Sequence, residues 1–369
     1  MSWRERLGRN WGRLGMKYKL SDICFYVKGK VDVSGLTDAD YISTENMMPN
    51  KGGVTIASSL PSTAQTQAYR KDDVLVSNIR PYFKKIWFAD CNGGCSNDVL
   101  VFRAKEDTDA RFLYYVLADD AFFDYSTATS KGTKMPRGDK TAIMQYEVPH
   151  FDLPIQKKIA GILADIDNKI SLNNNINKNL EQQAQAIFLK MFPDIFSTSA
   201  SSSFQNLIEF SNGKKRPEAI GDIPVYGGNG ILAYTNQSNA ENCVIIGRVG
   251  AYCGNTFLCS EKCWTSDNAI QAKSKNEDSQ LFIYYLLRNA SLPSRHIGTG
   301  QPLMTQAILN AVPVNEPSTQ EIRSFINVCT PLHEIIFANE KQNISLTLLR
   351  DTLLPKLMSG ELDVSDIDL

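Results

Sequence analysis

The feature that most restricts the fold of this 369-residue chain is an internal repeat. Residues 72–88, DDVLVSNIRPYFKKIWF, correspond to residues 241–257, ENCVIIGRVGAYCGNTF. Each copy predicts a strand, a turn with one arginine and one tyrosine, and a second strand. Three more pairs of segments follow in the same order: 95–117 with 265–287, 131–136 with 299–304, and 148–149 with 312–313. Because the offset between the copies changes only slowly, the chain predicts two similar domains related by duplication.

A long helical pattern follows each copy of the repeat. The first begins near Pro154 and ends near Met191, and its apolar residues recur about every 3.6 positions. The second opens with a capping box, Ser318 to Glu321, and reaches Leu357 with a mean apolar spacing of about 3.5 positions. Such long and narrow apolar stripes predict a coiled-coil seam. The predicted seam residues are Ile159, Ile162, Ile166, Leu180, Ile187, Leu332, Leu346 and Leu353.

Asparagines interrupt both apolar stripes, at Asn173 and Asn177 in the first helix and at Asn339 and Asn343 in the second. A buried amide in a coiled coil lowers stability but rejects wrong registers, because only the right pairing satisfies it. We therefore interpret the two helices as partners within one molecule. The alternative is two ordinary amphipathic helices, each packed on its own domain.

The composition is typical of a folded, soluble protein. Hydrophobic residues make up 43% of the chain and charged residues 21%. No run of about 18 apolar residues is present, so the sequence predicts no membrane span. The first 16 residues are basic and have no apolar segment, which argues against a secretory signal, and the expected compartment is the cytoplasm.

The charge balance alone does not indicate nucleic-acid binding. The net charge is −1, whereas a basic domain is the usual sign of a nucleic-acid partner. Any contact with DNA must therefore come from local clusters of cations or be shared with a partner protein. Two similar domains on a rigid spacer resemble a pseudo-dimer in one chain, and dimeric DNA readers use such a spacing to reach two half-sites.

Eight cysteines raise the question of a metal site. Cys91 and Cys95 are spaced C-x3-C, as are Cys259 and Cys263, with Cys243 and Cys253 upstream of the second pair. A structural zinc site normally uses tighter C-x2-C pairs, often with histidine. The histidines His150, His296 and His333 lie far from these cysteines in sequence. We expect reduced, partly buried thiols and no metal, with zinc as the alternative.

Several segments, in the same order along the chain, resemble the specificity (S) subunits of type I restriction–modification systems. The resemblance covers residues 17–365. In the domains its segments are VSNIRPYFKKIWFAD (76–90), GTKMPRGDK (132–140), IPVYGGNGI (223–231) and GRVGAYCGN (247–255). In the helices they are LPIQKKIAGILADIDNKISLNN (153–174), LEQQAQAIFLKMF (180–192) and LLPKLMSGELDV (353–364).

The resemblance implies a chain that reads DNA and leaves the chemistry to its partners. Two target-recognition domains would each read one half of a split site in double-stranded DNA, and two spacer helices would pack antiparallel. The chain would act with two modification (methyltransferase) subunits and with restriction subunits. S-adenosylmethionine, ATP and magnesium would bind to those partners, so no cofactor is expected on this chain.

The predicted fold class is α+β, a tandem repeat with pseudo-twofold symmetry. Two similar mixed α/β domains are joined by two long antiparallel coiled-coil helices. The predicted segments are an N-terminal extension (1–16), a first target-recognition domain (17–152), a first spacer helix (153–193), a serine-rich linker (194–203), a second target-recognition domain (204–316), a second spacer helix (317–358) and a C-terminal tail (359–369).

A search of the sequence for catalytic residues finds none that we assign. The segment Asn78 to Tyr82 has a bulky Ile-Arg pair where a methyltransferase loop needs Pro, and Gly227 to Gly230 predicts a tight turn. The acidic pairs Asp72–Asp73 and Asp119–Asp120 are expected to be isolated and solvated. Two alternatives stay open: a non-enzymatic protein–protein scaffold built on a coiled coil, and a self-contained DNA methyltransferase.

Candidate DNA-binding residues are the cations, amides and tyrosines of the predicted turns and loops, because these side chains read base edges and phosphates. Those of the first domain are Arg80, Tyr82, Lys84, Lys85, Lys131, Lys134 and Arg137. Those of the second domain are Lys214, Lys215, Arg216, Asn229, Arg248, Tyr252, Arg295 and Gln301. Arg80 and Arg248 are the strongest candidates because they occupy equivalent turns in the two copies. For each residue the alternative is a solvated surface charge or a structural ion pair.

Overall fold

The computed structural model describes residues 18–197, 200, 202–276, 279–298 and 300–367. The predicted N-terminal extension, and residue 299 of the second repeat, lie outside this range. The chain forms two compact units, one of Met1–Leu172 with Gln342–Leu369 and the other of Asn173–Lys341. We call the part of the first unit before residue 153 the first domain, and the part of the second unit from 202 to 316 the second domain.

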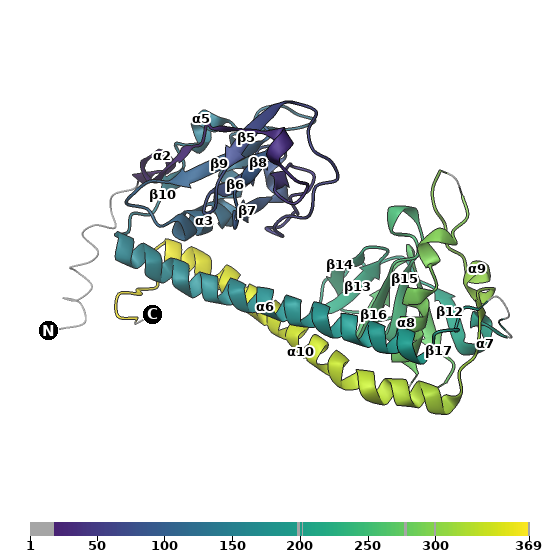
Figure 1. The fold of residues 1–369 in the computed structure, drawn as a ribbon. Coiled ribbons are helices and arrows are strands. Elements are labelled where there is room, and N and C mark those ends of the chain that lie inside the picture. Colours follow the sequence, from purple (N-terminus) through teal and green to yellow (C-terminus); the bar gives the residue numbers. More distant parts are fainter. Residues whose placement is uncertain (1–17, 198–199, 201, 277–278, 299, 368–369) are drawn as a thin grey trace. The chain divides into compact units, whose positions relative to one another are not determined.

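The first domain contains two four-stranded sheets and one pair of short strands (Figure 1). One sheet has the antiparallel order β2 (Cys24–Tyr26), β9 (Val99–Ala104), β6 (Val74–Ser77), β7 (Ile86–Phe88). The other has the order β3 (Lys30–Asp32), β5 (Gln65–Tyr69), β8 (Gly93–Cys95), β4 (Tyr41–Ile42), with β4 and β8 parallel. The short pair is β1 (Tyr18–Lys19) with β10 (Glu147–Val148).

Strands β6 and β9 form the centre of this domain because their apolar residues fill both faces of the sheet. All four residues of β6 and the first four of β9 are buried. Leu75 and Val101 face one core cluster, whereas Val76 and Phe102 face another, the pattern of a strand covered on both sides.

The helices of the first domain are short, and aspartate side chains cap three of them. They are α2 (Leu20–Ile23), η1 (Val33–Gly35), η2 (Pro81–Phe83), α3 (Ala110–Ala118), α4 (Asp120–Ala128) and α5 (Lys140–Ile143). Asp109, Asp119 and Asp139 accept backbone hydrogen bonds at the starts of α3, α4 and α5, as N-cap residues do.

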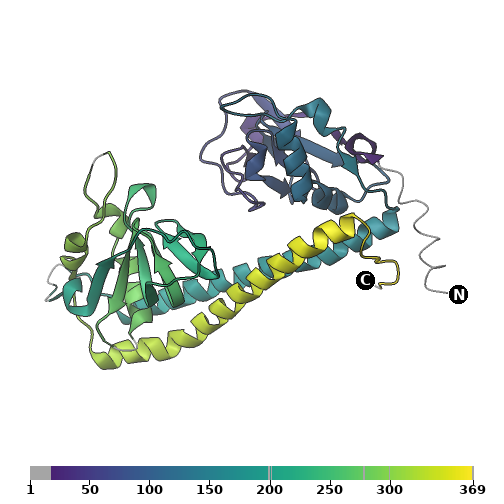
Figure 2. The same cartoon turned by 180° about the vertical axis from the view of Figure 1, so that it is seen from behind.

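The second domain is built on one six-stranded sheet (Figure 2). Its strand order is β12 (Ile208–Asn212), β17 (Ala269–Ser274), β15 (Ala240–Gly247), β16 (Thr256–Thr265), β13 (Ile223–Gly227), β14 (Gly230–Thr235). Strands β11 (Ser202–Ser203) and β18 (Pro313–Val314) form a separate antiparallel pair. The helices are α7 (Phe204–Leu207), η3 (Gly250–Tyr252), α8 (Gln280–Asn289), η4 (Leu292–Ser294) and α9 (Gln306–Asn310).

The two domains share the connectivity that the internal repeat predicts. The order β2-β9-β6-β7 in the first domain corresponds to β12-β17-β15-β16 in the second. The pair β1-β10 corresponds to β11-β18, and α3 corresponds to α8, since both helices follow the matching strand and carry the Tyr-Tyr pair. The predicted α+β tandem repeat is therefore confirmed.

Two long helices, α6 (Leu153–Met191) and α10 (Thr319–Met358), follow the two domains, and the division between the units passes through both. They pair antiparallel in each unit. In the first, Arg350 Nη1 of α10 lies 2.9 Å from Asp167 Oδ1 of α6. In the second, Asn339 Nδ2 of α10 donates to Asn177 Oδ1 of α6 at 2.8 Å.

The predicted seam residues contribute unequally to the helix packing. Ile159 and Ile166 are buried, whereas the other six are half-buried: Ile162, Leu180, Ile187, Leu332, Leu346 and Leu353. Larger side chains supply much of the buried contact, with Phe188 of α6 packing against Phe325 of α10 at a ring-centroid distance of 5.6 Å. Both helices also pack on their domains. The same turns of each helix therefore contact both the partner helix and a domain.

One aspartate that the sequence suggests to be solvated is not, although its neighbour Asp72 is exposed. Asp73 is fully buried, and Arg103 donates two hydrogen bonds to it, from Nε to Oδ1 at 2.7 Å and from Nη2 to Oδ2 at 2.8 Å. The expectation for Asp73 is wrong because its partner lies on β9, which the strand pairing brings beside β6. A bidentate pair of this kind offsets the cost of burying the carboxylate.

All eight cysteines are free, and seven of them are buried. Cys243 Sγ and Cys263 Sγ lie 4.0 Å apart in the core of the six-stranded sheet, and the Cys243 thiol together with burial raises the pKa of Cys263 to about 12. In the part of the chain that the structure describes, no three His, Cys, Asp or Glu side chains are grouped so as to hold a metal ion. None of the helices in that part has the length and apolar character that a membrane span requires.

Candidate nucleic-acid interface

The connection between β6 and β7 forms a braced turn, which we call the first arginine turn (residues 79–85). Arg80 and Lys84, on either side of η2, both have a φ of 50°, in the left-handed region that side chains other than glycine rarely adopt. Such conformations persist only where the surroundings impose them. Here the Arg80 amide donates to the Pro136 carbonyl at 2.8 Å, and the Lys51 amide donates to the Lys84 carbonyl at 2.8 Å.

The first arginine turn packs on a loop that we call the first hairpin loop (residues 131–137). Lys131 and Arg137 exchange two backbone hydrogen bonds of 2.9 Å, which close the loop. Arg137 also forms an isolated bridge with Ile79 at the start of the arginine turn. The structure therefore brings together two candidate segments that lie about 50 residues apart in the sequence.

The second domain repeats this arrangement. The second arginine turn (residues 248–252) joins β15 to β16. The second hairpin loop (residues 297–303) is closed by Ile297 and Leu303, whose backbone amides and carbonyls form hydrogen bonds of 3.0 and 2.9 Å. Leu303 also bridges to Val249, as Arg137 bridges to Ile79 in the first domain. Each domain thus places an arginine turn against a hairpin loop, and the resemblance between the copies extends to their backbone contacts.

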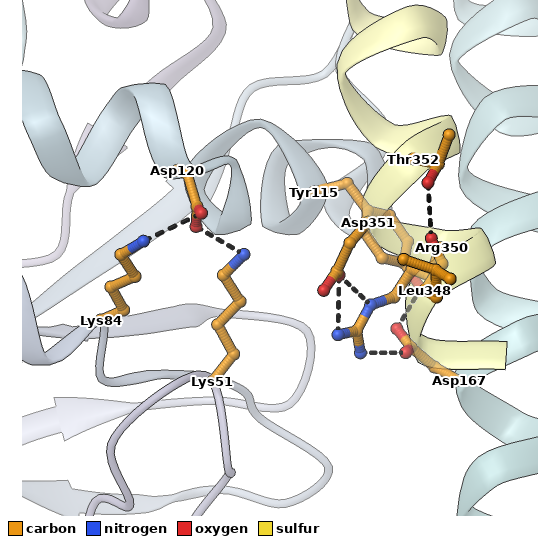
Figure 3. A network of polar contacts seen from close by, with 9 residues as sticks. All are labelled: Lys51, Lys84, Tyr115, Asp120, Asp167, Leu348, Arg350, Asp351 and Thr352. Atoms are coloured by element: carbon orange, nitrogen blue, oxygen red, sulfur yellow. Dashed lines mark hydrogen bonds and ion pairs between the residues drawn. The ribbon is translucent and has the colours of Figure 1, made fainter. Parts of the chain in front are cut away.

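Three of the six candidate cations of the first domain, Lys84, Lys131 and Arg137, are already paired with carboxylates within it. Lys84 Nζ lies 2.9 Å from Asp120 Oδ2, and Lys51 Nζ lies 2.8 Å from the other oxygen of the same carboxylate (Figure 3). On the hairpin loop, Lys131 pairs with Asp139 and Arg137 pairs with Asp98. These residues have a structural reason for their charge, so their positions alone do not assign them to DNA.

Lys85 is held in another way. Its Nζ donates to the Thr44 carbonyl at 2.6 Å, and burial lowers the pKa of this ammonium. In the second domain, Arg295 Nε donates to the Ala290 carbonyl at 2.7 Å. Both side chains therefore stabilise their own loops.

Arg80 and Arg248 differ from these paired cations. Within the described residues, the Arg80 side chain makes no hydrogen bond or ion pair, and its buried Nε has no partner. The buried Nε of Arg248 also lacks a partner, and its Nη1 reaches only the Asp267 carbonyl at 3.4 Å. Among the residues that the structure describes, no carboxylate neutralises either guanidinium, so each domain has an arginine without an ion pair in this turn.

The other candidates of the second domain gather beside the second arginine turn. Asn229 lies in the β-hairpin turn between β13 and β14. Gly247 allows this turn to approach, because a Cβ added there would lie 2.1 Å from the Tyr252 carbonyl oxygen and 3.1 Å from the Gly228 Cα. Gln301 is exposed on the second hairpin loop, and Lys134 is exposed on the first.

The basic segment Lys214 to Arg216 follows β12 and is tied to the end of β16. The Lys214 amide donates to the Thr265 carbonyl at 3.0 Å, and Trp264 Nε1 donates to the Lys214 carbonyl at 3.1 Å. The loop after β16 in turn bonds the second arginine turn, because the Arg248 amide donates to the Asn268 carbonyl at 3.0 Å. The segment therefore borders the same edge of the domain.

Sequence reasoning missed the residues that brace the first arginine turn and the first hairpin loop, namely Lys51 and Asp120 for the turn and Asp98 for the loop. Their contacts join segments far apart in the chain, and no local pattern predicts such pairings. One signal was available: the Asn50-Lys51-Gly52-Gly53 run is typical of a turn, and three of its residues have positive φ values.

Both domains are anchored to the long helices by the second tyrosine of their Tyr-Tyr pair. Tyr115 Oη donates to Asp167 Oδ2 at 2.7 Å, and the same carboxylate pairs with Arg350 (Figure 3). Tyr285 Oη lies 2.8 Å from His333 Nε2 of α10. Burial raises the pKa of both tyrosines, so both hydroxyls stay protonated at neutral pH.

A family model described as the type I restriction modification DNA specificity domain matches residues 15–182 and 205–345. The chain belongs to this family. The two matched regions contain the two copies of the arginine turn and hairpin loop, so the duplication seen in the structure is a duplication of the family domain.

Curated relatives carry the same family name. The HindI specificity subunit of a type I restriction enzyme from Haemophilus influenzae is 29% identical over 189 residues, which cover 48% of this chain and 40% of that protein. The MjaIX specificity subunit from Methanocaldococcus jannaschii is 22% identical over 387 residues, covering 91% of this chain and 88% of that protein. The chain thus spans less than half of the first relative and most of the second.

A solved structure has the same fold. The S subunit of a type I restriction-modification system from M. genitalium superposes with a TM-score of 0.56 at 19% identity. The superposition covers 93% of this chain and 96% of that chain, so the shared fold includes both domains and both long helices.

Proposed function

We propose that this chain is a DNA-binding specificity subunit that recognises a two-part target, one half-site with each domain. The observation that carries the proposal is the recurrence of an arginine turn on a hairpin loop in both domains of a DNA specificity family, with a guanidinium that forms no ion pair among the described residues. The shared backbone bonds match Arg248 to Asn78 and Arg80 to Gly250, so the two arginines occupy different positions of corresponding turns. A scaffold for proteins has no need for an uncommitted cation in this turn of both domains.

We assign different roles to the cations of this surface. Arg80 and Arg248 read base edges, since an arginine reads guanine through two parallel hydrogen bonds in the major groove. Lys134 and the segment Lys214 to Arg216 contact phosphates and position the domains. The cations that are paired inside the first domain, such as Lys84 and Arg137, hold the reading turn in shape.

The long helices serve as the spacer between the two reading domains in this proposal. The target-recognition domains comprise residues 17–152 and 204–316, and the spacer helices comprise 153–193 and 317–358. Helices α6 and α10 have 39 and 40 residues, so each is long enough to act as a stiff rod.

The chain directs catalytic partners and has no catalytic role of its own. Two modification subunits and, for cleavage, restriction subunits assemble with it, and S-adenosylmethionine, ATP and magnesium bind to those partners. Asn78 begins the segment whose sequence most resembles a methyltransferase loop. It is buried, and its backbone forms hydrogen bonds with Asp98 and Gly138, which supports this assignment. A buried side chain of this kind cannot hold a substrate base.

Mapping methylated bases in cells that express the chain with its methyltransferase partner tests the proposal. We expect one two-part motif, and exchange of residues 17–150 for those of a relative changes one half of the motif and leaves the other intact. If the exchange alters both halves, the assignment of one half-site to each domain is wrong.

Binding measurements separate the alternatives. The purified complex should bind its target with an affinity that falls steeply as salt rises, because neutralised phosphates release counterions. Absent or salt-independent binding would favour a protein scaffold. Binding of S-adenosylmethionine by the chain alone would favour a self-contained methyltransferase.

A further inference from the structure

The tip of the first arginine turn displays two aromatic rings to solvent. Tyr82 is 48% exposed and Phe83 is 38% exposed, and their ring centroids lie 4.8 Å apart. Pro81, which precedes them, is buried and fixes the start of η2. Large apolar side chains that are exposed as a contiguous pair usually mark a binding surface.

Three separate segments hold this tip in place. The Asn50 and Lys51 amides donate to the carbonyls of Phe83 and Lys84, both at 2.8 Å. In the first hairpin loop, the Pro136 carbonyl accepts a hydrogen bond from the Arg80 amide. At the start of α4, Asp120 pairs with the ammonium groups of Lys51 and Lys84 (Figure 3). The turn is therefore rigid, although two of its residues have unfavourable left-handed backbones.

The charge around the rings identifies the kind of ligand. Arg80 and Lys85 lie within the same seven-residue turn as the rings, and Lys85 Nζ lies 5.9 Å from the centroid of the Phe83 ring, whereas Lys84 is paired with Asp120. Apolar side chains flanked by cations match a stacked and negatively charged duplex. DNA-bending proteins insert such rings between base pairs, where they unstack one step and kink the helix.

We propose that Tyr82 and Phe83 form a wedge that enters between two base pairs of the half-site read by the first domain. This proposal rests on the DNA-binding function above. Insertion requires rings held in advance of binding, because a flexible loop would lose its entropy on entering the stack. The bracing by Asn50, Lys51 and Asp120 meets that requirement.

The wedge belongs to the first domain alone. In the second arginine turn Tyr252 is 47% exposed, but the next residue is Cys253, which is buried. Tyr252 is a single ring beside glycine-rich backbone. It can stack on a sugar or a base, but no second ring is next to it to fill the gap between two unstacked base pairs. Unstacking is therefore confined to one half-site. Its position should coincide with a flexible pyrimidine–purine step, since such steps open at the lowest cost.

The test uses the full chain in complex with its methyltransferase subunit and a duplex that carries the mapped target. 2-Aminopurine replaces one base at a time across the half-site of the first domain, because its fluorescence rises when it is unstacked. We expect a several-fold rise at one step with the wild-type complex. The double substitution Tyr82→Ala with Phe83→Ala abolishes the rise and weakens specific binding on the order of tenfold.

Two further variants serve as controls. Phe25→Ala removes a ring of similar exposure, 43%, from β2, at the edge of the four-stranded sheet opposite β7. This variant should keep the full fluorescence rise. Tyr82→Leu with Phe83→Leu keeps an apolar wedge and should retain unstacking, which separates insertion from a specific need for aromatic rings.

Three results would overturn the wedge. One is tight specific binding with no fluorescence rise at any position, and another is an undiminished rise in the double alanine variant. The third is a double alanine variant that no longer assembles with the methyltransferase, since the rings would then be a protein-docking surface. A wild-type complex with no specific DNA binding would instead refute the proposed function itself.

Discussion

His333 makes the docking of the second domain sensitive to acid. The imidazole lies on α10 with only 5% of its surface exposed, and it pairs with Tyr285 Oη. Burial is the main cause that lowers the pKa of His333 from 6.5 to about 4; Glu181 opposes the shift and Arg288 adds to it. The folded protein therefore holds this imidazole neutral well below the pH at which an exposed histidine takes up a proton.

The sign and size of the effect follow from these values. The unfolded chain binds more protons than the folded chain between pH 6.5 and about pH 4, so the free energy of unfolding falls as the pH falls through this window. At about 1.4 kcal/mol per pH unit, the ceiling is about 3 kcal/mol. Between pH 7 and pH 5 the loss is about 2 kcal/mol.

Substitution His333→Gln isolates this contribution. Glutamine can still pair with the Tyr285 hydroxyl but does not titrate, so the part of the acid response that belongs to His333 should disappear. We expect hydrogen exchange of α8 and of the first half of α10 to show about 2 kcal/mol less acid destabilisation in the variant than in the wild type. His150→Gln, which removes a half-buried histidine stacked on Tyr18 in the first domain, should leave the response of these segments unchanged. An equal acid response in wild type and His333→Gln would refute the reasoning.

Three further predictions concern single substitutions. Arg80→Lys and Arg248→Lys should each relax the sequence specificity at one base position in one half of the methylated motif. The expected loss of discrimination is about 1–3 kcal/mol, because lysine cannot bond guanine bidentately. Loss of specificity in both halves from one substitution would contradict the assignment. Asp73→Asn should lower the free energy of unfolding of the first unit by about 3 kcal/mol in urea titrations, since it breaks a buried bidentate pair. Asp167→Asn should cost about 2 kcal/mol in the same titration through its bonds to a tyrosine and an arginine, whereas the exposed Asp165→Asn should cost little; equal costs would show that the anchor does not stabilise the unit.

The sequence was sufficient to predict the α+β tandem repeat because duplication leaves an internal comparison within one chain. Strand, turn and helix signals that are weak singly became specific when the turn that contains Arg80 matched the turn that contains Arg248 and the Tyr-Tyr pairs matched each other. The long helices were also predictable, because apolar residues that keep a helical spacing over roughly ten turns are typical of a long helix and of no strand.

The pairing of charged side chains was not predictable. Asp73 looked solvated because its partner, Arg103, is about 30 residues away and meets it only after β6 and β9 pair. Likewise, nothing local distinguishes Lys84, which Asp120 holds, from an uncommitted cation such as Lys134. Deciding which cations of the candidate interface are free to meet DNA therefore requires the tertiary structure.

The two anchors show what was duplicated. Tyr115 docks on Asp167 of α6, the helix that follows the first domain, and Tyr285 docks on His333 of α10, the helix that follows the second. The repeating module is therefore a domain together with its following helix. Each module also receives a charged group from the other module's helix, Arg350 in the first unit and Glu181, which pairs with Arg288, in the second. Because these cross-links lie beside the docking tyrosines, the pairing of the helices and the docking of each domain stabilise each other, so a change in the seam is transmitted to the reading domains.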